Sequence, residues 1–275
     1  MVALAKSGLS FTETIEFPAL NEAGKDVAYF TVPAAFDPQK PFFLVIFFHG
    51  FDEPFAEQIE RLALASQVAS SGANCILVCP RTAIDRATET NPGKLGDEDY
   101  FEKFLGALPP HVEKRLAGQG VDTTGFLERA AAAPLVVATF SAGHRLASCA
   151  VSYEAVLERL AACVFFDSLY RSDCYYISPK SVLEAGALVG VHRKIYDRGT
   201  PDELNNHANL SASLVKIGHS PLPSIDAAAT LHAGVAVMES VDIADHWRIV
   251  ADSSRLAAIL RKVDTRPAAR PPSLV

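Results

Sequence analysis

The sequence has no long apolar run and no excess of basic residues. No apolar stretch approaches the ~20 residues that a membrane-spanning helix needs. The first residues, MVALAKSGLSF, lack the apolar stretch and cleavage site typical of a signal peptide, so we expect no secretory signal. The formal net charge of −7 disfavours nucleic acid or an anionic membrane surface as the main partner. We therefore expect a cytoplasmic protein that binds neither nucleic acid nor a membrane.

Cysteine is scarce, and its spacing does not suit a metal. None of the five cysteines has the spacing of a zinc ligand pair. Cys75 and Cys79 fall along one apolar run and Cys163 falls in another, which is typical of small buried residues in a reducing compartment. The acidic residues just before His246 have no second histidine nearby. We expect neither a metal nor a cofactor.

The composition indicates one globular domain. The chain has 275 residues, of which 49% are hydrophobic and 21% are charged, and no internal repeat is evident. We expect a single domain over residues 1–262 and a frayed tail, rich in proline and arginine, over residues 263–275. A homodimer is compatible with this composition.

Strand and helix patterns alternate along the chain. Residues 12–17 and 27–32 predict an antiparallel hairpin around NEAGKD. The further strands are predicted at residues 41–48, 74–80, 134–140, 161–166, 191–197 and 234–241. The helices are predicted at residues 55–72, 142–160, 181–188, 202–216 and 246–263. This order predicts an α/β fold with a mostly parallel central sheet and helices on both faces.

One long segment, residues 82–133, interrupts this alternation. It is too long for a simple connection, and we expect one or two helices and a loop that borders the site. We interpret it as a cap or insertion.

Polar residues follow the predicted strands, and in a parallel sheet the carboxyl ends of the strands share one edge. A serine, several carboxylates and a histidine are therefore expected together at that edge, in the chain order Ser, Asp, His. The residues that follow the strands are His49, Gly50, Phe51, Arg81, Ser141, Asp167, Asp197, Asp202, Asp242, Asp245 and His246.

This order and topology resemble the α/β-hydrolase superfamily over residues 42–260. The resemblance rests on HGF at residues 49–51, TFSAG at 139–143, Asp167 and His246. It implies that Ser141 is the nucleophile on a strand-to-helix turn and that His246 is its general base. It also implies an oxyanion hole formed by the backbone N–H groups of Phe51 and Ala142.

The serine motif has two weak points. The first small residue of the turn is usually glycine, and here it is the β-branched Thr139. The S-x-G pattern also occurs at Ser70, but only Ser141 has a strand before it and a helix after it. The alternative interpretation is that Ser141 is a helix N-cap.

The base and the acid have several candidates. His246 follows the last strand in a short loop, whereas His144 lies within the helix after Ser141, and His49 belongs to the oxyanion loop. The superfamily most often places the acid after the strand at residues 191–197, which favours Asp202 or Asp197. A minority place it one strand earlier, at Asp167, where FFDSLY resembles a subset of bacterial hydrolase-like proteins. We prefer Asp167, because a rigid central strand suits a carboxylate that orients an imidazole.

The sequence thus predicts a serine hydrolase that cleaves a small-molecule ester or amide through an acyl-enzyme, without a cofactor. Phe51, Phe55, Tyr170, Tyr175, Tyr176 and Trp247 are candidates to line an aromatic cleft. One alternative keeps the fold but uses it for a lyase, perhydrolase or acyltransferase reaction. Another is an inactive binding module, for which Thr139 is the argument.

Overall fold

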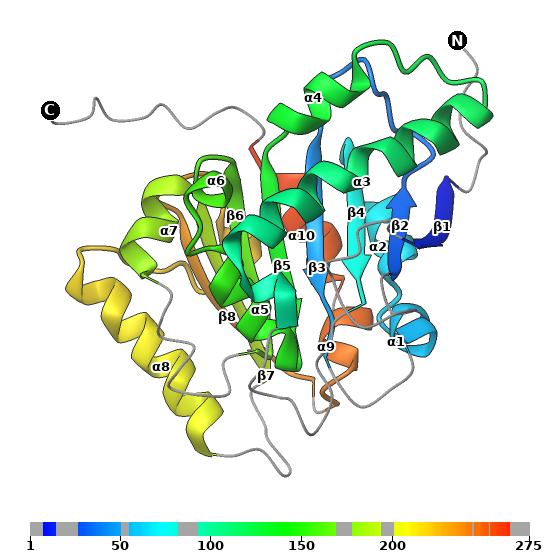
Figure 1. Cartoon of the computed structure of the whole chain (residues 1–275). Helices are drawn as coiled ribbons and strands as arrows, with labels where there is room; N and C mark the ends of the chain where they lie inside the picture. Colours follow the sequence, from blue (N-terminus) through cyan, green and yellow to red (C-terminus); the bar gives the residue numbers. More distant parts are fainter. Residues whose placement is uncertain are drawn as a thin grey trace, which may run out of the picture.

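The structure is a computed structural model that describes residues 8–14, 27–50, 55–81, 93–168, 178–193, 201–243, 245–252 and 254–264. An eight-stranded sheet runs through it in the order β1-β2-β4-β3-β5-β6-β7-β8 (Figure 1). The strands are β1 Leu9–Thr14, β2 Val27–Val32, β3 Phe43–Phe48, β4 Cys75–Pro80, β5 Leu135–Phe140, β6 Leu160–Phe166, β7 Ala187–Arg193 and β8 Ala236–Val241.

The sheet is mostly parallel, as the alternating pattern predicts. β1 pairs with β2 and β2 with β4 in antiparallel fashion, whereas the pairs from β4 across to β8 are all parallel. The predicted N-terminal hairpin is therefore confirmed, although β1 begins at Leu9, three residues before the predicted strand. Its turn, NEAGKD, lies outside the described residues.

The register aligns the carboxyl ends of the central strands. Phe48 of β3 is opposite Thr139, and Phe140 is opposite Phe166 of β6. Phe166 is in turn opposite Val191 of β7. Strands β3, β5 and β6 are buried on both faces along their whole length, which explains their unbroken apolar runs. The residues that follow these strands therefore share one edge.

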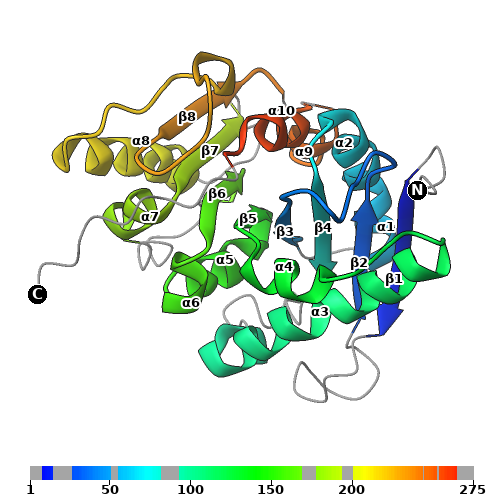
Figure 2. The ribbon, with the colours of Figure 1, turned by 90° about the horizontal axis from the view of Figure 1, so that it is seen from above.

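Helices cover both faces of the sheet (Figure 2). One core cluster joins the sheet to α3 through α8, and the other joins it to α1, α2, α9 and α10. The bounds are α1 Phe55–Arg61, α2 Leu64–Ser71, α3 Glu98–Gly118, α4 Phe126–Ala132, α5 His144–Ala150, α6 Glu154–Leu157, α7 Pro179–Ala185, α8 Pro201–Lys216, α9 Arg248–Ala251 and α10 Arg255–Lys262. None of the described helices is long and apolar enough to cross a membrane.

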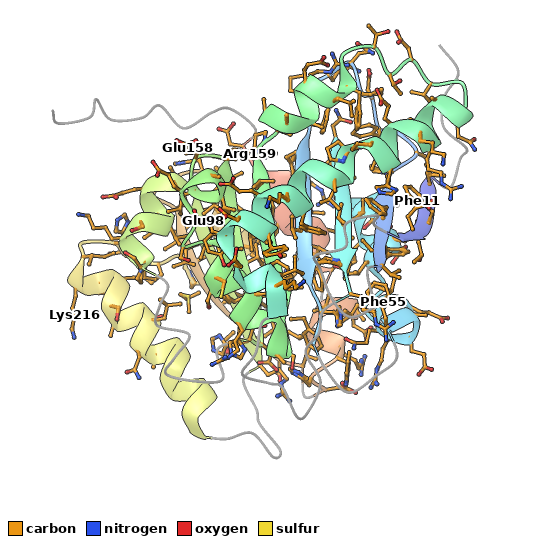
Figure 3. All side chains as sticks on the ribbon, in the orientation of Figure 1. Phe11, Phe55, Glu98, Glu158, Arg159 and Lys216 are labelled. Atoms are coloured by element: carbon orange, nitrogen blue, oxygen red, sulfur yellow. The ribbon has the colours of Figure 1, made fainter. Side chains whose placement is uncertain are left out.

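The segment predicted as a cap or insertion contributes α3 and α4 to one of these layers. Phe101 of α3 is fully buried, and its ring lies 6.1 Å from that of Phe48 in β3. The Arg159 side chain, labelled in Figure 3, donates to the backbone oxygens of Ala130 and Ala133 and so ties the end of α4 to the start of β6. The two predicted helices are present, and the cap stays a prediction because residues 82–92 lie outside the described residues.

Three predicted helices are each divided in two, and local side-chain bonds accompany the first two breaks. The helix predicted at residues 55–72 breaks at Ala63, which has a left-handed backbone (φ 51°). Next to this break, the side-chain amide of Gln67 donates to the Leu62 carbonyl. The helix predicted at residues 142–160 breaks after Ala150, where the Ser152 hydroxyl donates to the Cys149 carbonyl. Such side-chain bonds compete with the next helical turn.

Boundaries near the C-terminus differ as well. The helix predicted at 181–188 is α7, which is preceded by the N-cap residue Ser178 and followed by the C-cap residue Gly186. A Cβ at Gly186 would lie 2.7 Å from the backbone oxygen of Leu160, so the chain passes tightly there into β7. β7 therefore begins four residues before the predicted strand. The helix predicted at 246–263 is divided into α9 and α10, with Ser254 in a left-handed conformation.

We expect α3 to be an integral part of the core. Phe101→Ala should lower the free energy of unfolding by about 3–5 kcal/mol, because it removes a buried ring and leaves a cavity. Leu127→Ala in α4, where the side chain is 40% exposed, should cost less than about 1 kcal/mol. Urea unfolding followed by circular dichroism measures both. Equal stability of the two variants would mean that α3 is not part of the cooperative core.

Candidate active site

Ser141 lies on a tight turn directly after β5. Its backbone is left-handed (φ 53°), and a short 3-10 helix, Ser141–Gly143, leads into α5. Gly143 is required by close approach: a Cβ there would lie 2.4 Å from the backbone oxygen of Phe48 and 2.6 Å from Thr139 Oγ1. Thr139 itself is fully buried beneath the turn. The β-branched Thr139 therefore fits the turn, because Gly143 has no side chain and leaves room for the threonine hydroxyl.

The structure brings His246 and Asp167 together. The Nδ1–H of His246 donates to Asp167 Oδ2 over 2.7 Å. Asp167 is fully buried, directly follows β6, and has a left-handed backbone (φ 46°). The imidazole packs against the ring of Phe140, with the ring centres 4.5 Å apart. With Nδ1 bonded to the carboxylate, Nε2 is the atom of His246 that can accept a proton.

Sequence reasoning missed one partner of Asp167. The Nε–H of Arg193, the last residue of β7, donates to the same Oδ2 that His246 contacts. The backbone N–H of Asp167 donates to the Val191 oxygen over 2.8 Å. The signal that could have found Arg193 is its place in β7, the strand that pairs with the one before Asp167.

The loop after β3 passes directly beside Ser141. A Cβ on Gly50 would lie 3.0 Å from Ser141 Cβ and 3.5 Å from its Oγ, so only glycine leaves room for the serine side chain. Ala142 is buried in the first turn after the serine. Phe51, the other predicted oxyanion donor, lies outside the described residues.

His49 supports this loop from below. Its Nδ1 lies 2.5 Å from the Gly50 oxygen and 3.2 Å from Gln58 Oε1 of α1. Both partners are acceptors, so Nδ1 carries the proton. Burial lowers the pKa of His49 to about 4, so the ring is neutral near pH 7. The ring of Phe55, labelled in Figure 3 at the start of α1, packs at a tilt against this ring, with the ring centres 5.4 Å apart.

The other candidates are placed differently. Ser70 is an ordinary helical serine that donates to the Gln67 oxygen in α2. His144 is buried in α5, with Nδ1 3.2 Å from the backbone oxygen of Ser141. Asp245 accepts from the backbone N–H of Trp247.

Several candidates fall outside the described parts of the chain. Asp202 is the second residue of α8, but its side chain is not described. Asp197 and the three candidate cleft tyrosines lie outside the described residues. Within the described residues, no cluster of three or more His, Cys, Asp or Glu side chains could hold a metal ion.

Comparison of the fold with solved structures finds close neighbours. A ferulic acid esterase matches with a TM-score of 0.60 at 13% identity, covering 94% of this chain and 99% of that one. An S-formylglutathione hydrolase from Agrobacterium tumefaciens matches with a TM-score of 0.58 at 13% identity, covering 94% and 97%. The fluorophosphonate-binding serine hydrolase FphF of Staphylococcus aureus matches with a TM-score of 0.57 at 10% identity, covering 92% and 98%. No protein-family model matches the chain, and no curated protein matches it significantly.

The chain has the α/β-hydrolase fold. The resemblance is therefore confirmed at the level of fold. In this fold the nucleophile stands on a strained turn between a strand and a helix, and here the turn joins β5 to α5. The catalytic roles of Ser141, His246 and Asp167 stay predictions.

The turn of this α/β-hydrolase fold offers a test of its packing. Gly143→Ala should lower the free energy of unfolding by about 1–3 kcal/mol, because the new methyl group meets the Phe48 carbonyl. Gly143 has φ −61°, which alanine adopts freely, so the loss reports the close approach alone.

A second glycine provides the matched control for this substitution. A Cβ at Gly106 in α3 meets nothing within 4 Å, so Gly106→Ala should be neutral or stabilise by up to about 1 kcal/mol. Urea unfolding compares the two variants. A Gly143→Ala chain as stable as the unaltered chain would contradict the packing described for the turn.

Proposed function

We propose that this chain is a serine hydrolase that cleaves an ester or amide through an acyl-enzyme. The observation that carries the proposal is the 2.7 Å bond from His246 to a buried carboxylate, at the sheet edge where Ser141 stands on its strained turn. A histidine held by a carboxylate at the same site as a serine is the arrangement that activates a hydroxyl nucleophile. Ser141 is the nucleophile, His246 the general base and Asp167 the orienting acid.

The reaction has two halves. Ser141 Oγ attacks the acyl carbonyl and its proton passes to His246 Nε2, while Asp167 stabilises the imidazolium. The tetrahedral intermediate then breaks its bond to the leaving alcohol or amine, which takes that proton. Water next attacks the acyl-serine with His246 again as base, and the acid product leaves with Ser141 restored. No cofactor enters this scheme.

The developing oxyanion needs donors that are already in place. We assign this role to the backbone N–H of Ala142 and to that of Phe51, which follows the Gly50 backbone packed beside Ser141. One such donor is worth about 3 kcal/mol of activation free energy in enzymes of this kind. His49 supports the role by donating to the Gly50 carbonyl from inside the protein, and Gln58 Oε1 accepts from the same ring nitrogen of His49.

The names of the structural neighbours guide the choice of substrates. One is a ferulic acid esterase and another an S-formylglutathione hydrolase. We therefore propose a small-molecule acyl substrate and place esters ahead of amides in a substrate panel. Trp247, whose ring packs 5.0 Å from Phe140 beside the site, is the described aromatic residue best placed to meet the substrate.

The nucleophile is tested by covalent labelling. A fluorophosphonate probe should label the unaltered chain, because an activated serine attacks phosphorus as it attacks a carbonyl. Ser141→Ala should abolish the label, whereas Ser70→Ala should leave it unchanged. Labelling is read by in-gel fluorescence and the modified peptide by mass spectrometry.

Two results would count against this assignment. One is an unaltered chain that takes no label, which would favour an inactive binding module. The other is a Ser141→Ala chain that labels as well as the parent. Labelling without turnover of any ester or amide would instead favour a non-hydrolytic reaction at the same serine.

The acid is tested by two amide substitutions. Asp167→Asn should lower kcat/KM for a nitrophenyl ester by about 10³- to 10⁴-fold, because the imidazole loses its ionic partner. Asparagine tolerates the left-handed backbone of residue 167, so the turn itself should survive. Asp202→Asn should change kcat/KM by less than about threefold. The reverse ranking would move the acid to the segment after β7.

A further inference from the structure

The carboxylate of Asp167 has a second partner besides His246, and this one is a permanent cation. The Nε–H of Arg193 donates to Oδ2, the oxygen that also accepts from His246, and the backbone N–H of Arg193 donates to Oδ1 over 3.4 Å. The Arg193 side chain is 12% exposed and that of Asp167 is fully buried. The pair is therefore largely removed from water. Charges interact more strongly in the protein interior than in water.

Strand pairing fixes this contact. β7 lies beside β6, and the Val191 oxygen accepts from the backbone N–H of Asp167. Arg193 is two residues beyond Val191, so the side chains of Val191 and Arg193 point to the same face of β7. The guanidinium thus reaches the carboxylate from the neighbouring strand, whereas His246 reaches it from the segment after β8.

Arg193 also changes the charge that His246 experiences. An arginine is permanently charged, so Asp167 and Arg193 together carry no net charge. Protonating His246 then creates a net positive charge in a buried site. Without Arg193, the same protonation would neutralise a lone buried carboxylate and would be more favourable.

We propose that Arg193 is a positioning residue that keeps Asp167 ionised and whose charge offsets that of Asp167 at the His246 imidazole. The proposal rests on the proposed function for its catalytic meaning, since a neutral His246 is the form that accepts the Ser141 proton. Its structural basis, one carboxylate oxygen shared by a guanidinium and an imidazole, does not depend on the reaction.

Other charged or titratable groups near His246 are few among the described residues. Asp245 is exposed and bonded to the next backbone N–H, and Arg61 of α1 lies over the neighbouring indole, 4.5 Å from its centre. Burial lowers the pKa of His192 in β7, which disfavours a further cation beside Asp167. Among the described residues, the charged and titratable groups that these contacts place near the site are Asp167, Arg193, His192, Asp245 and Arg61.

The proposal is tested by titrating His246 directly. In ¹⁵N-labelled protein carrying Ser141→Ala, the imidazole signals are followed by NMR across pH, and His246 is assigned by the signal that His246→Gln removes. Arg193→Met should raise the midpoint of this titration by about one pH unit or more, because the neutralising cation is gone. Arg193→Lys keeps the charge and should hold the midpoint within about 0.3 unit.

The same shift should appear in kinetics on the serine-containing chain. The acidic limb of the pH profile of kcat/KM should move upward in Arg193→Met by the same amount as the NMR midpoint. Arg193→Gln is measured in parallel, and its acidic limb should move in the same direction, because the amide lacks the charge. The amide keeps a hydrogen-bond donor, so this variant serves if Arg193→Met does not fold.

Two outcomes would overturn the role of Arg193. One is a folded Arg193→Met or Arg193→Gln chain whose His246 midpoint does not move. The other is an Arg193→Lys chain that shifts as far as Arg193→Met, because charge would then not be the cause. Either result leaves fluorophosphonate labelling of Ser141 intact, whereas an unlabelled chain would count against the proposed function whatever the titrations show.

Discussion

The buried carboxylate of Asp167 joins three neighbouring segments at the carboxyl edge of the sheet. It follows β6, accepts from Arg193 at the end of β7, and accepts from His246 after β8. An ionised carboxylate with no exposed surface is costly unless it is paired and hydrogen-bonded. The buried carboxylate is therefore stable only while both partners stay in place. Arg193 comes from β7 and His246 from the segment after β8, and parallel pairing aligns both strands with β6.

Backbone strain at this edge is concentrated at two adjacent strand ends. Ser141 and Asp167 both have left-handed backbones, and the residues before them, Phe140 and Phe166, are opposite one another in the sheet. A left-handed conformation costs a residue with a side chain about 1–2 kcal/mol. Such conformations persist where surrounding structure over-determines them. Here that structure is two fully buried apolar strands, which fix the direction in which each chain leaves the sheet.

The fold was predictable because the strands are buried on both faces. Continuous apolar runs such as FLVIFF, separated by helical patterns, leave few alternatives to a parallel sheet. The serine turn was predictable for the same reason, since its context of strand and helix distinguishes Ser141 from Ser70. Helix interruptions were not predictable, because they depend on local competition such as the Ser152 hydroxyl at the Cys149 carbonyl.

Arg193 shows why a small boundary error hides a functional candidate. A strand predicted at residues 191–197 places Arg193 in its middle and Asp197 at its end, which made Asp197 a candidate acid. β7 begins at Ala187, directly after Gly186 passes close to Leu160, and Arg193 is the last of its residues that the structure describes. The glycine contact is made with a distant part of the chain, so no local pattern reports it. The pairing of β7 with β6 then brings Arg193 to the carboxylate, and so sets the charge that surrounds the proposed base.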